Sequence, residues 1–412
     1  MTSGSSADPQ SLRLLVVADG DSYLKWGARR ASEAPSSWVR SMVLVESAVS
    51  PSRAQVVAAV GAEAAASVRR LTMRELVREL VGDPPDVLIL ACRGPLIETL
   101  LDDHLRGRRA AGVVITGIAG LWMPPTTTGL RHRAGADLFI THSVREREAV
   151  AALLPVGRLA HTALASFVQR APEAHAAKRD LIIFAPQPQV PASPADRVRL
   201  LRALYDVALT RPNLTVVVKE RGLPGESLTH DDPYPFSALA ATLPEPLPSN
   251  VEFRTGPIGP FLARAAGFVT VNSSSAIEAI AAGSPVLCLL DMQDGTAAFN
   301  QVFEGSGVEG TLDDLAIGAF RHPRHGWLDA NYFHPDEEND WVSMATTLAT
   351  RDPKEYENWR AVWLRSRTIA GRLHAARVRA IALGSADVWW RRWVYRVVAP
   401  WINTRRGSHR PS

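Results

Sequence analysis

Short runs of apolar, often β-branched residues alternate with longer stretches of helical periodicity along most of this chain. In its first part these runs lie at residues 12–18, 39–45, 86–91, 112–115 and 136–141. Each run is mostly apolar, with its polar residues chiefly near the start, which is typical of strands that helices cover on both faces. Helices are expected at 72–81, which opens with Thr72 and Glu75 at capping-box spacing, and at 144–154. This alternation predicts a parallel sheet.

The alternation stops between about residues 154 and 180, where prolines, a glycine and an alanine-rich run predict an interdomain link. A second cycle then follows, with strands expected at 181–185, 214–219, 251–254, 268–271 and 285–290, and helices at 194–210, 260–266 and 275–282. Since 412 residues exceed what one hydrophobic core usually supports, we expect two domains. The predicted fold class is α/β, with two Rossmann-like, doubly wound domains, residues 1–160 and 161–350, that face a central cleft.

The C-terminal segment, residues 351–412, has a different character. It is expected to begin with a long helix over 353–383 that packs back across both domains. The tail after it is rich in aromatic and basic residues: Trp389, Trp390, Arg391, Arg392, Trp393, Tyr395, Arg396, Trp401, Arg405 and Arg406. This mixture suits the membrane interface, where aromatic rings lie at headgroup depth and arginines meet anionic lipid. A helix that covers the domains and then frays explains the tail equally well.

Composition bounds the location of the protein and its partners. The hydrophobic fraction of 46% and charged fraction of 21% are those of a globular protein, and no apolar run approaches the roughly 20 residues that span a bilayer. Residues 1–10 do not resemble a secretory signal. We therefore expect a cytoplasmic protein, with peripheral contact at the inner face of the cell membrane if the tail binds lipid. The formal charge of +4 is too small to indicate nucleic acid as a partner.

The segment 268–290, FVTVNSSSAIEAIAAGSPVLCLL, reads as strand, hydroxyl-rich turn, helix, glycine turn and strand. Asn272 ends the first strand, and Ser273, Ser274 and Ser275 occupy the turn and the first helical positions. Free backbone N–H groups and the helix dipole favour a phosphate there. Glu278 lies at helical spacing from these serines, placed to reach the helix start or a ribose. A plain N-cap needs only one serine, so three in succession favour phosphate or nucleotide contact over capping alone.

This segment resembles a motif of GT-B glycosyltransferases that make capsular polysaccharides, including sialyl- and Kdo-transferases. In that pattern a strand leads into Asn-Ser-Ser/Thr, a Glu-Ala follows in the helix, and a Gly-x-Pro-Val turn comes next. The matching residues are Asn272, Ser273, Ser274, Glu278, Ala279, Gly283, Pro285 and Val286. Upstream, VVVKER at 216–221 is similar to the family's strand ending in Lys-x-His-Pro. Lys219 agrees with that pattern, whereas Arg221 and Gly222 stand where His and Pro are usual.

The resemblance implies a glycosyltransferase that moves a sugar from a nucleotide-sugar donor to a hydroxyl of a cell-surface glycan or lipid-linked acceptor. It implies that Lys219 and Arg221 bind the donor phosphate, and a guanidinium can do so through two hydrogen bonds. The serine turn is most similar to that of cytidine-nucleotide users, which implies a CMP-linked acidic sugar. A sugar-nucleotide 2-epimerase of the same fold is the enzymatic alternative, although its usual Ser-Gly-Gly turn is here Ser-Ser-Ser. A non-catalytic nucleotide-sugar-binding protein is the third.

Transfer with inversion needs a general base for the attacking hydroxyl. Asp19 and Asp21 flank Gly20 at the end of the first predicted strand, where parallel sheets gather their ligands. Either aspartate is a candidate base, and helix capping is the alternative. Gly20 is expected on the acceptor side, together with Lys25 and Trp26 just beyond it. No Asp-x-Asp of the metal-binding kind follows a central strand, so we expect no metal and no cofactor, with basic groups stabilising the leaving phosphate.

Three further residues follow predicted strands. Gln187 ends the turn after 181–185 and could meet a base or phosphate, or merely connect strand to helix. Gly117 lies in a turn after the fourth run and would let a ligand approach the backbone on the acceptor side. His142 is a candidate acid or base, although a lone histidine before a serine more often serves a cap or a hydrogen bond.

Overall fold

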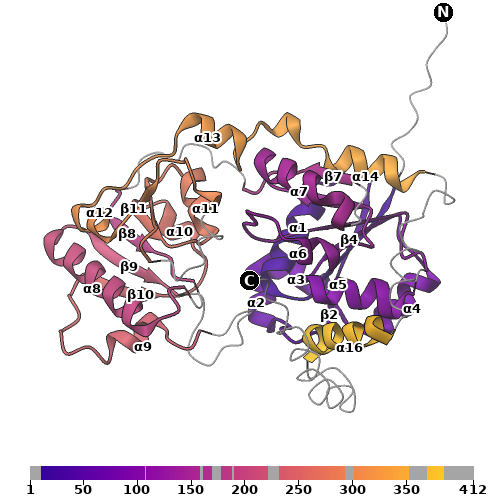
Figure 1. Cartoon of the computed structure of the whole chain (residues 1–412), viewed down its shortest axis with the longest axis horizontal. Helices are drawn as coiled ribbons and strands as arrows, with labels where there is room; N and C mark the ends of the chain where they lie inside the picture. The colour runs from indigo at the N-terminus through magenta and orange to yellow at the C-terminus, as the bar shows by residue number, and fades with distance from the viewer. Residues whose placement is uncertain are drawn as a thin grey trace, which may run out of the picture.

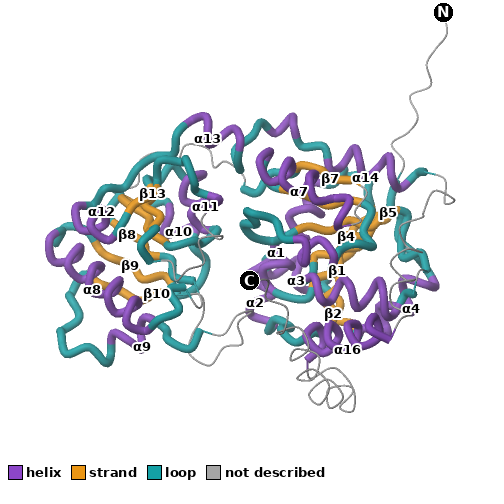
Figure 2. The backbone as a smooth tube through the Cα atoms, viewed as in Figure 1, coloured by secondary structure: helices purple, strands orange, loops and turns teal. Residues whose placement is uncertain are grey.

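In the computed structural model, the chain forms two α/β domains that lie side by side (Figure 1). The structure describes residues 11–106, 108–157, 161–168, 178–187, 190–220, 232–292, 301–351 and 369–384. Each domain contains one parallel sheet with helices around it (Figure 2). The expected α/β class with two Rossmann-like domains is therefore confirmed.

The N-terminal sheet has seven strands within the described residues, in the order β3-β2-β1-β4-β5-β6-β7. They are β1 (Arg13–Ala18), β2 (Val39–Val45), β3 (Arg69–Leu71), β4 (Val87–Ala91), β5 (Val113–Gly117), β6 (Leu138–Thr141) and β7 (His161–Leu164). All neighbours are parallel, and Val16 of β1 lies between Met42 of β2 and Ile89 of β4. The five predicted strands are present. The short β3 and β7 are additional, and β7 extends this domain past the expected boundary at residue 160.

Helices cover both faces of this sheet, as uninterrupted apolar strands require. They are α1 (Asp21–Glu33), α2 (Arg53–Val60), α3 (Ala62–Ser67), α4 (Met73–Gly82), α5 (Gly94–Glu98), the π-helical η1 (Thr99–His104), α6 (Thr127–Arg131) and α7 (Val144–Gly157). Alternate residues of β1 enter opposite cores: Leu15 and Val17 pack with α4 and α5, whereas Leu14 and Val16 pack with α1. The predicted capping box of Thr72 and Glu75 is present at α4.

The second domain repeats this plan with the strand order β10-β9-β8-β11-β12-β13. Its strands are β8 (Leu181–Phe184), β9 (Thr215–Lys219), β10 (Val251–Arg254), β11 (Ala265–Thr270), β12 (Val286–Leu289) and β13 (Glu309–Gly310). Its helices are α8 (Pro194–Thr210), α9 (Phe236–Ala240), α10 (Gly259–Leu262), α11 (Ser275–Ala281), α12 (Leu312–Ile317) and α13 (His325–Ala330). The predicted helix 194–210 has the bounds of α8.

After the short η3 (Asp336–Glu338) the chain returns to the N-terminal domain and forms α14 (Trp341–Ala349) there (Figure 1). Trp341, Ala345 and Leu348 recur at helical spacing and are buried in the core beneath β1 and α1. These residues were expected in the second domain, whose predicted range ended at 350. The difference arises because the apolar stripe of α14 does not reveal which domain it covers.

The last described helix is α16 (Ile369–Leu383), which packs against α5 and η1 of the N-terminal domain. The expected long helix is thus present in its second part, and its packing within the described residues is on one domain rather than across both. Residues 352–368 and the aromatic, basic tail lie outside the described residues. In the part of the chain that the structure covers, no helix is long and apolar enough to cross a membrane.

Candidate functional site

In each sheet, the strand order reverses direction between the first strand and the fourth. Here β1 lies beside β4, and β8 lies beside β11. At such a switch point the two connecting loops run to opposite faces, which leaves a crevice outside the carboxyl ends of the strands. The loops at these points carry Asp19 to Ser22 in one domain and Asn272 to Ser275 in the other. The fold therefore places two of the predicted sequence segments at its two natural ligand crevices.

A cavity of about 420 Å³ lies between the domains, and helices that follow these two crevices form its walls. Ser22, Lys25 and Arg29 come from one face of α1, at helical spacing. Ser274 and Glu278 come from the facing side of the α11 segment. Apolar side chains complete the lining: Trp26, Ala119, Phe167, Val168, Leu262, Ala281 and Ala282. Both domains thus contribute polar groups to a single interdomain cavity, which we call the cleft.

An ion pair joins the two walls of the cleft. Lys25 Nζ lies 3.5 Å from Glu278 Oε1, with the lysine side chain 66% exposed and the glutamate side chain 30% exposed. Lys25 was expected on the acceptor side and Glu278 on the donor side. Because both remain accessible to solvent, a ligand that enters the cleft can compete for each partner.

The loop between β1 and α1 is held by Asp19. Its carboxylate is fully buried and accepts hydrogen bonds from Arg93 Nε at 2.8 Å and from the Arg93 backbone N–H at 3.0 Å. Burial raises the pKa of Asp19, and the charge of Arg93 opposes that shift. Gly20 is the N-cap of α1, and Asp21 is its partly exposed first residue. Of the two aspartates proposed as base, Asp19 is therefore enclosed in an ion pair, and Asp21 lies next to Ser22 of the cleft wall.

His142 forms a buried hydrogen-bonded unit with the tryptophan of the cleft. Trp26 Nε1 donates to His142 Nε2 at 2.6 Å, and His142 Nδ1 donates to the carbonyl of Ala165 at 2.9 Å. The ring is 1% exposed, and burial followed by the charge of Arg30 lowers its pKa to about 3. Both ring nitrogens are occupied, so this arrangement assigns His142 to the support of Trp26 rather than to proton transfer.

Gly117, expected to let a ligand approach, serves the same tryptophan instead. A Cβ atom at this position would lie 2.6 Å from Cζ2 of Trp26 and 2.9 Å from the Ile140 carbonyl oxygen. The residue is buried, and the nearest residue of its turn that lines the cleft is Ala119. The glycine is needed because the indole packs directly on β5.

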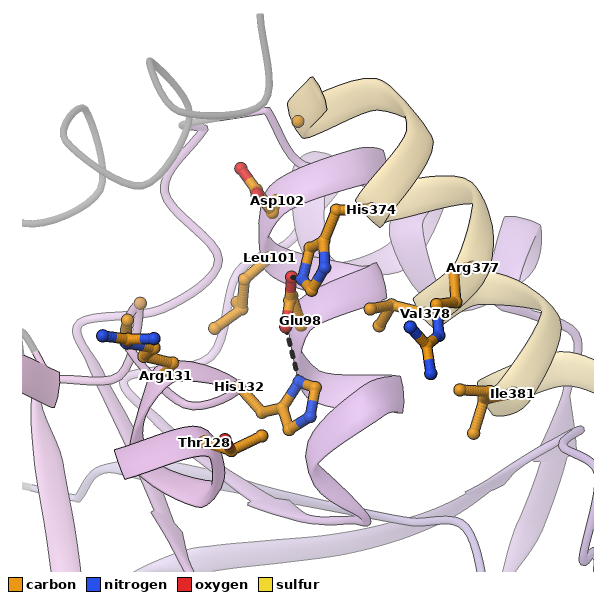
Figure 3. Close-up of a pocket in the computed structure, with 13 residues that line it drawn as sticks. Glu98, Leu101, Asp102, Thr128, Arg131, His132, His374, Arg377, Val378 and Ile381 are labelled. Carbon is orange, nitrogen blue, oxygen red and sulfur yellow. Dashed lines mark hydrogen bonds and ion pairs between the residues drawn. The ribbon is translucent and has the colours of Figure 1, made fainter. Parts of the chain in front are cut away.

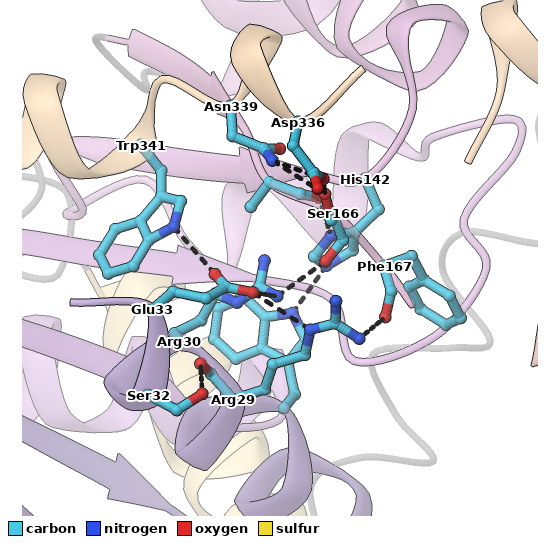
Figure 4. Close-up of polar contacts among 12 residues, drawn as sticks. Arg29, Arg30, Ser32, Glu33, His142, Ser166, Phe167, Asp336, Asn339 and Trp341 are labelled. Carbon is cyan, nitrogen blue, oxygen red and sulfur yellow. Dashed lines mark hydrogen bonds and ion pairs between the residues drawn. The ribbon is translucent and has the colours of Figure 1, made fainter. Parts of the chain in front are cut away.

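The segments through which the chain leaves and re-enters the N-terminal domain, at 166–167 and 336–341, lie close to α1 (Figure 4). Arg29 Nη1 donates to the carbonyl of Phe167 at 2.7 Å, and the fully buried Arg30 donates to the carbonyl of Ser166 at 2.7 Å. In turn, Ser166 Oγ donates to Asp336 at 2.9 Å and accepts from Asn339 at 2.9 Å. The helix that forms one wall of the cleft therefore also fixes the outgoing and returning chain segments.

The serine turn has a divided role. Ser273 is buried, and its Oγ accepts from the backbone N–H of Ser275 at 3.3 Å. Ser274 is the residue before α11, has no capping hydrogen bond, and lines the cleft. Asn272 is 8% exposed, and its Oδ1 has no hydrogen-bond partner among the described residues. Of the three serines, Ser274 is the one that lines the cleft.

Lys219 and Gln187 are not among the residues that line the cleft. Lys219 ends β9, is 7% exposed and donates to the carbonyl of Glu220 at 3.1 Å, and burial lowers its pKa. Gln187 is partly buried, and its backbone forms a bridge with Val190. Arg221 lies outside the described residues. Among the described residues, no cluster of three or more His, Cys, Asp or Glu side chains could hold a metal ion.

Several residues of the site were not found from the sequence. Arg93 follows a predicted strand, whereas Arg29 and Arg30 lie within α1. Nothing local marks their roles, because the groups that they hold, on Asp19, Phe167 and Ser166, are distant in the chain. Trp26 was expected with Lys25 on the acceptor side and does line the cleft, although its contact with His142 was not foreseen. A helical face that carries Ser22, Lys25 and Arg29 at spacings of three and four residues was the one signal available.

Comparison with solved structures agrees with this architecture. The S. aureus MnaA–UDP co-structure matches with 11% identity and a TM-score of 0.50, covering 80% of this chain and 91% of that chain. UDP-GlcNAc 2-epimerase from Neisseria meningitidis bound to UDP-GlcNAc matches with 10% identity and a TM-score of 0.49, covering 82% and 98%. The glycotransferase of kitacinnamycin matches with 13% identity and a TM-score of 0.42, covering 91% and 98%. At such identities the likeness concerns the fold alone, which is GT-B-like. No curated protein sequence matches this chain significantly.

A sequence-family profile settles the relationship that the fold alone leaves broad. It matches residues 14–348, from the first strand of the N-terminal domain to the end of α14, and so includes both walls of the cleft. The chain belongs to the family described as "Putative glycosyltransferase (DUF6716)".

Proposed function

We propose that this protein is a metal-independent glycosyltransferase that moves a sugar from a nucleotide-activated donor to a hydroxyl of a glycan or lipid-linked acceptor. One observation supports this most: the cleft between the two switch points is bridged by an accessible cation from one domain and an accessible carboxylate from the other. A nucleotide sugar presents both complementary groups, an anionic phosphate and the donor hydroxyls of its ribose.

The donor lies against α11 in this proposal. Glu278 accepts hydrogen bonds from ribose hydroxyls, Ser274 donates its hydroxyl to a phosphate oxygen, and Lys25 provides the positive charge that the leaving phosphate requires. Lys25 takes this role in place of Lys219, whose ammonium is buried at the end of β9. Arg221 is kept as a second phosphate ligand on the strength of the motif resemblance.

Asp21 is the proposed general base. It accepts the proton of the acceptor hydroxyl as that oxygen bonds to the anomeric carbon. The bond from this carbon to the phosphate oxygen breaks, the nucleotide leaves with the electron pair, and the configuration inverts. Asp21 is favoured over Asp19 and His142 because those two side chains are buried, whereas Asp21 is partly exposed and precedes Ser22 of the cleft lining.

The donor is proposed to be a CMP-linked acidic sugar, on the basis of the serine-turn resemblance. A thermal-shift panel of CMP, CDP, UDP and GDP tests both the site and this choice. A nucleotide at one hundred times its dissociation constant should stabilise the folded protein by about 2.7 kcal/mol. Stabilisation by UDP in place of CMP would change the proposed donor to a UDP-linked sugar. Failure of all four nucleotides to stabilise the protein would contradict a nucleotide site.

Catalysis is tested separately from binding. The donor in this assay is the sugar-linked form of the nucleotide that stabilises the protein. A glycosyltransferase should pass its sugar unchanged to water or to an acceptor. Interconversion of the donor into its 2-epimer without acceptor would contradict transfer and assign the fold to epimerisation.

The setting is also a proposal. A cytoplasmic enzyme of cell-envelope polysaccharide synthesis would meet its acceptor at the inner membrane face, and the Trp- and Arg-rich sequence at 385–412 supports contact there. Vesicle sedimentation of the full chain, compared with a chain ending at residue 384, tests this. Equal sedimentation of both chains with anionic vesicles would contradict a role for the tail.

A further inference from the structure

Helix α16 lies beyond the residues that the family profile matches, yet it is built into the N-terminal domain. The profile ends at residue 348, and α16 covers Ile369–Leu383. Val378, Ala382 and Leu383 are buried, and the latter two belong to the core that contains α4 and α5. In Figure 1 this helix runs along the face of the domain beside α5.

A carboxylate between two histidines fixes the first half of α16 (Figure 3). Glu98 of α5 accepts from His374 Nε2 of α16 at 2.7 Å and contacts His132 Nδ1, next to α6, at 2.5 Å. A second ion pair joins Arg379 Nη1 to Asp103 Oδ2 at 2.7 Å. These contacts hold the helix beside a cavity of about 560 Å³ and set its position along α5 and η1.

The last turn of α16 reaches the loops at the carboxyl ends of the central strands. The carbonyl oxygen of Ala382 accepts from the backbone N–H of Ala48 at 3.1 Å and from Arg93 Nη2 at 3.2 Å. Gly384, with φ of +52°, ends the helix so close that a Cβ atom would lie 2.8 Å from Cβ of Ala48. A carbonyl at a helix C-terminus carries partial negative charge, which favours the guanidinium.

Arg93 links the end of α16 to the β1–α1 turn, which precedes the proposed base Asp21. Its Nε and backbone N–H both donate to the buried carboxylate of Asp19, whose own carbonyl accepts from Ser47 Oγ at 2.9 Å. Asp19 lies two residues before Asp21. The guanidinium is thus held between the end of α16 and the turn that precedes α1.

We infer that α16 is a structural part of the active site, and that Arg93 and Asp19 are positioning residues that hold the β1–α1 turn and thereby fix Asp21 at the start of α1, beside Ser22 of the cleft lining. This inference rests on the proposed function for the role of Asp21. The anchoring of the turn by α16 does not depend on which substrate the enzyme uses.

Hydrogen–deuterium exchange of the full chain tests the anchoring. Arg93→Lys keeps the charge beside Asp19 but lacks the second donor toward Ala382, and Gly384→Ala forces α16 away from Ala48. In both variants, amide exchange in residues 18–24 should rise about tenfold, because the turn opens locally without global unfolding. Arg372→Ala is the matched control: Arg372 is exposed on the same helix, and no ion pair to it is present in the described part of the chain.

Unchanged exchange at 18–24 in both variants would overturn the inference. An equal rise in residues 275–281 of the second domain would do so as well, because it would show general destabilisation. The activity readout is the ratio of sugar transfer to donor hydrolysis, with the nucleotide sugar selected by the thermal-shift panel. Loss of positioning lowers this ratio, whereas a smaller folded fraction lowers both rates equally. If no nucleotide stabilises the wild-type chain, the proposed function fails, and the exchange experiment still decides whether α16 anchors the turn.

Discussion

Replacement of Glu278 by alanine separates its contribution to stability from its contribution to binding. Its ion pair with Lys25 spans 3.5 Å between side chains that are 66% and 30% exposed, so its loss should cost about 0.2–1 kcal/mol. That corresponds to a melting temperature lower by at most about 4 °C. The unliganded protein should therefore remain folded and close to wild type in stability.

Binding should suffer more. A ribose hydroxyl that donates to a carboxylate contributes about 1.5–3 kcal/mol. Because the nucleotide must first displace Lys25 from Glu278, the ion pair offsets about 0.2–1 kcal/mol of this gain. The net loss in Glu278→Ala is then about 0.5–2.8 kcal/mol, or roughly a 2- to 100-fold weaker dissociation constant.

Isothermal titration of the nucleotide that stabilises the wild-type chain measures this change directly. Glu337→Ala, an exposed glutamate outside the cleft lining, is the control and should bind as wild type does. An unchanged dissociation constant in Glu278→Ala would refute the assignment of Glu278 to the ribose. A melting temperature lowered well beyond 4 °C would refute the view that the ion pair is only a weak link between the walls.

Asp21→Asn should reduce transfer by about 10²- to 10⁴-fold in steady-state kinetics and leave nucleotide titrations unchanged; retained turnover would place the base elsewhere. Gly117→Ala should lower the free energy of unfolding in urea by about 1–3 kcal/mol, since the new Cβ meets Trp26 and backbone, and a neutral effect would contradict that packing. Trp26→Phe should cost about 1–3 kcal/mol by the same assay, because it removes the hydrogen bond to a buried imidazole. The hydrogen bond to Glu98 raises the pKa of His374 above 6.5, so the contact stabilises α16 fully below that pH and weakens as pH rises through the raised value. Protection of the amides in 369–384, relative to their intrinsic exchange rates, should therefore fall as pH rises above 6.5 in wild type, and His374→Ala should abolish that dependence; an unaltered profile would assign it to another group.

The central strands were predictable because a parallel sheet buried on both faces leaves long apolar runs. Residues 86–91 illustrate this, since the predicted run contains β4 (Val87–Ala91), all five residues of which are apolar and buried. The strands that escaped prediction lie farther from the centre of each sheet. In Arg69–Leu71 two of the three residues are exposed arginines, and β13 has only two residues, so neither produces an apolar signal.

Only part of the candidate site was predictable, because a sequence pattern reports on residues that are neighbours in the chain. Strand ends and helix starts can be read from neighbouring residues, which is why Ser274 and Glu278 were found and do line the cleft. The partners that decide the role of Asp19 and His142 lie 74 and 116 residues away, at Arg93 and Trp26. Contacts over such separations depend on the completed fold.

The return of the chain to its starting domain through α14 has a consequence for how this protein can be divided. The second domain is inserted into the sequence of the first, between β7 and Trp341. A fragment that stops before the inserted domain would expose the apolar surface that Trp341, Ala345 and Leu348 cover. The first domain can be isolated only if its two separate segments are joined by a short linker. The inserted domain could be exchanged for that of a relative without interrupting either core.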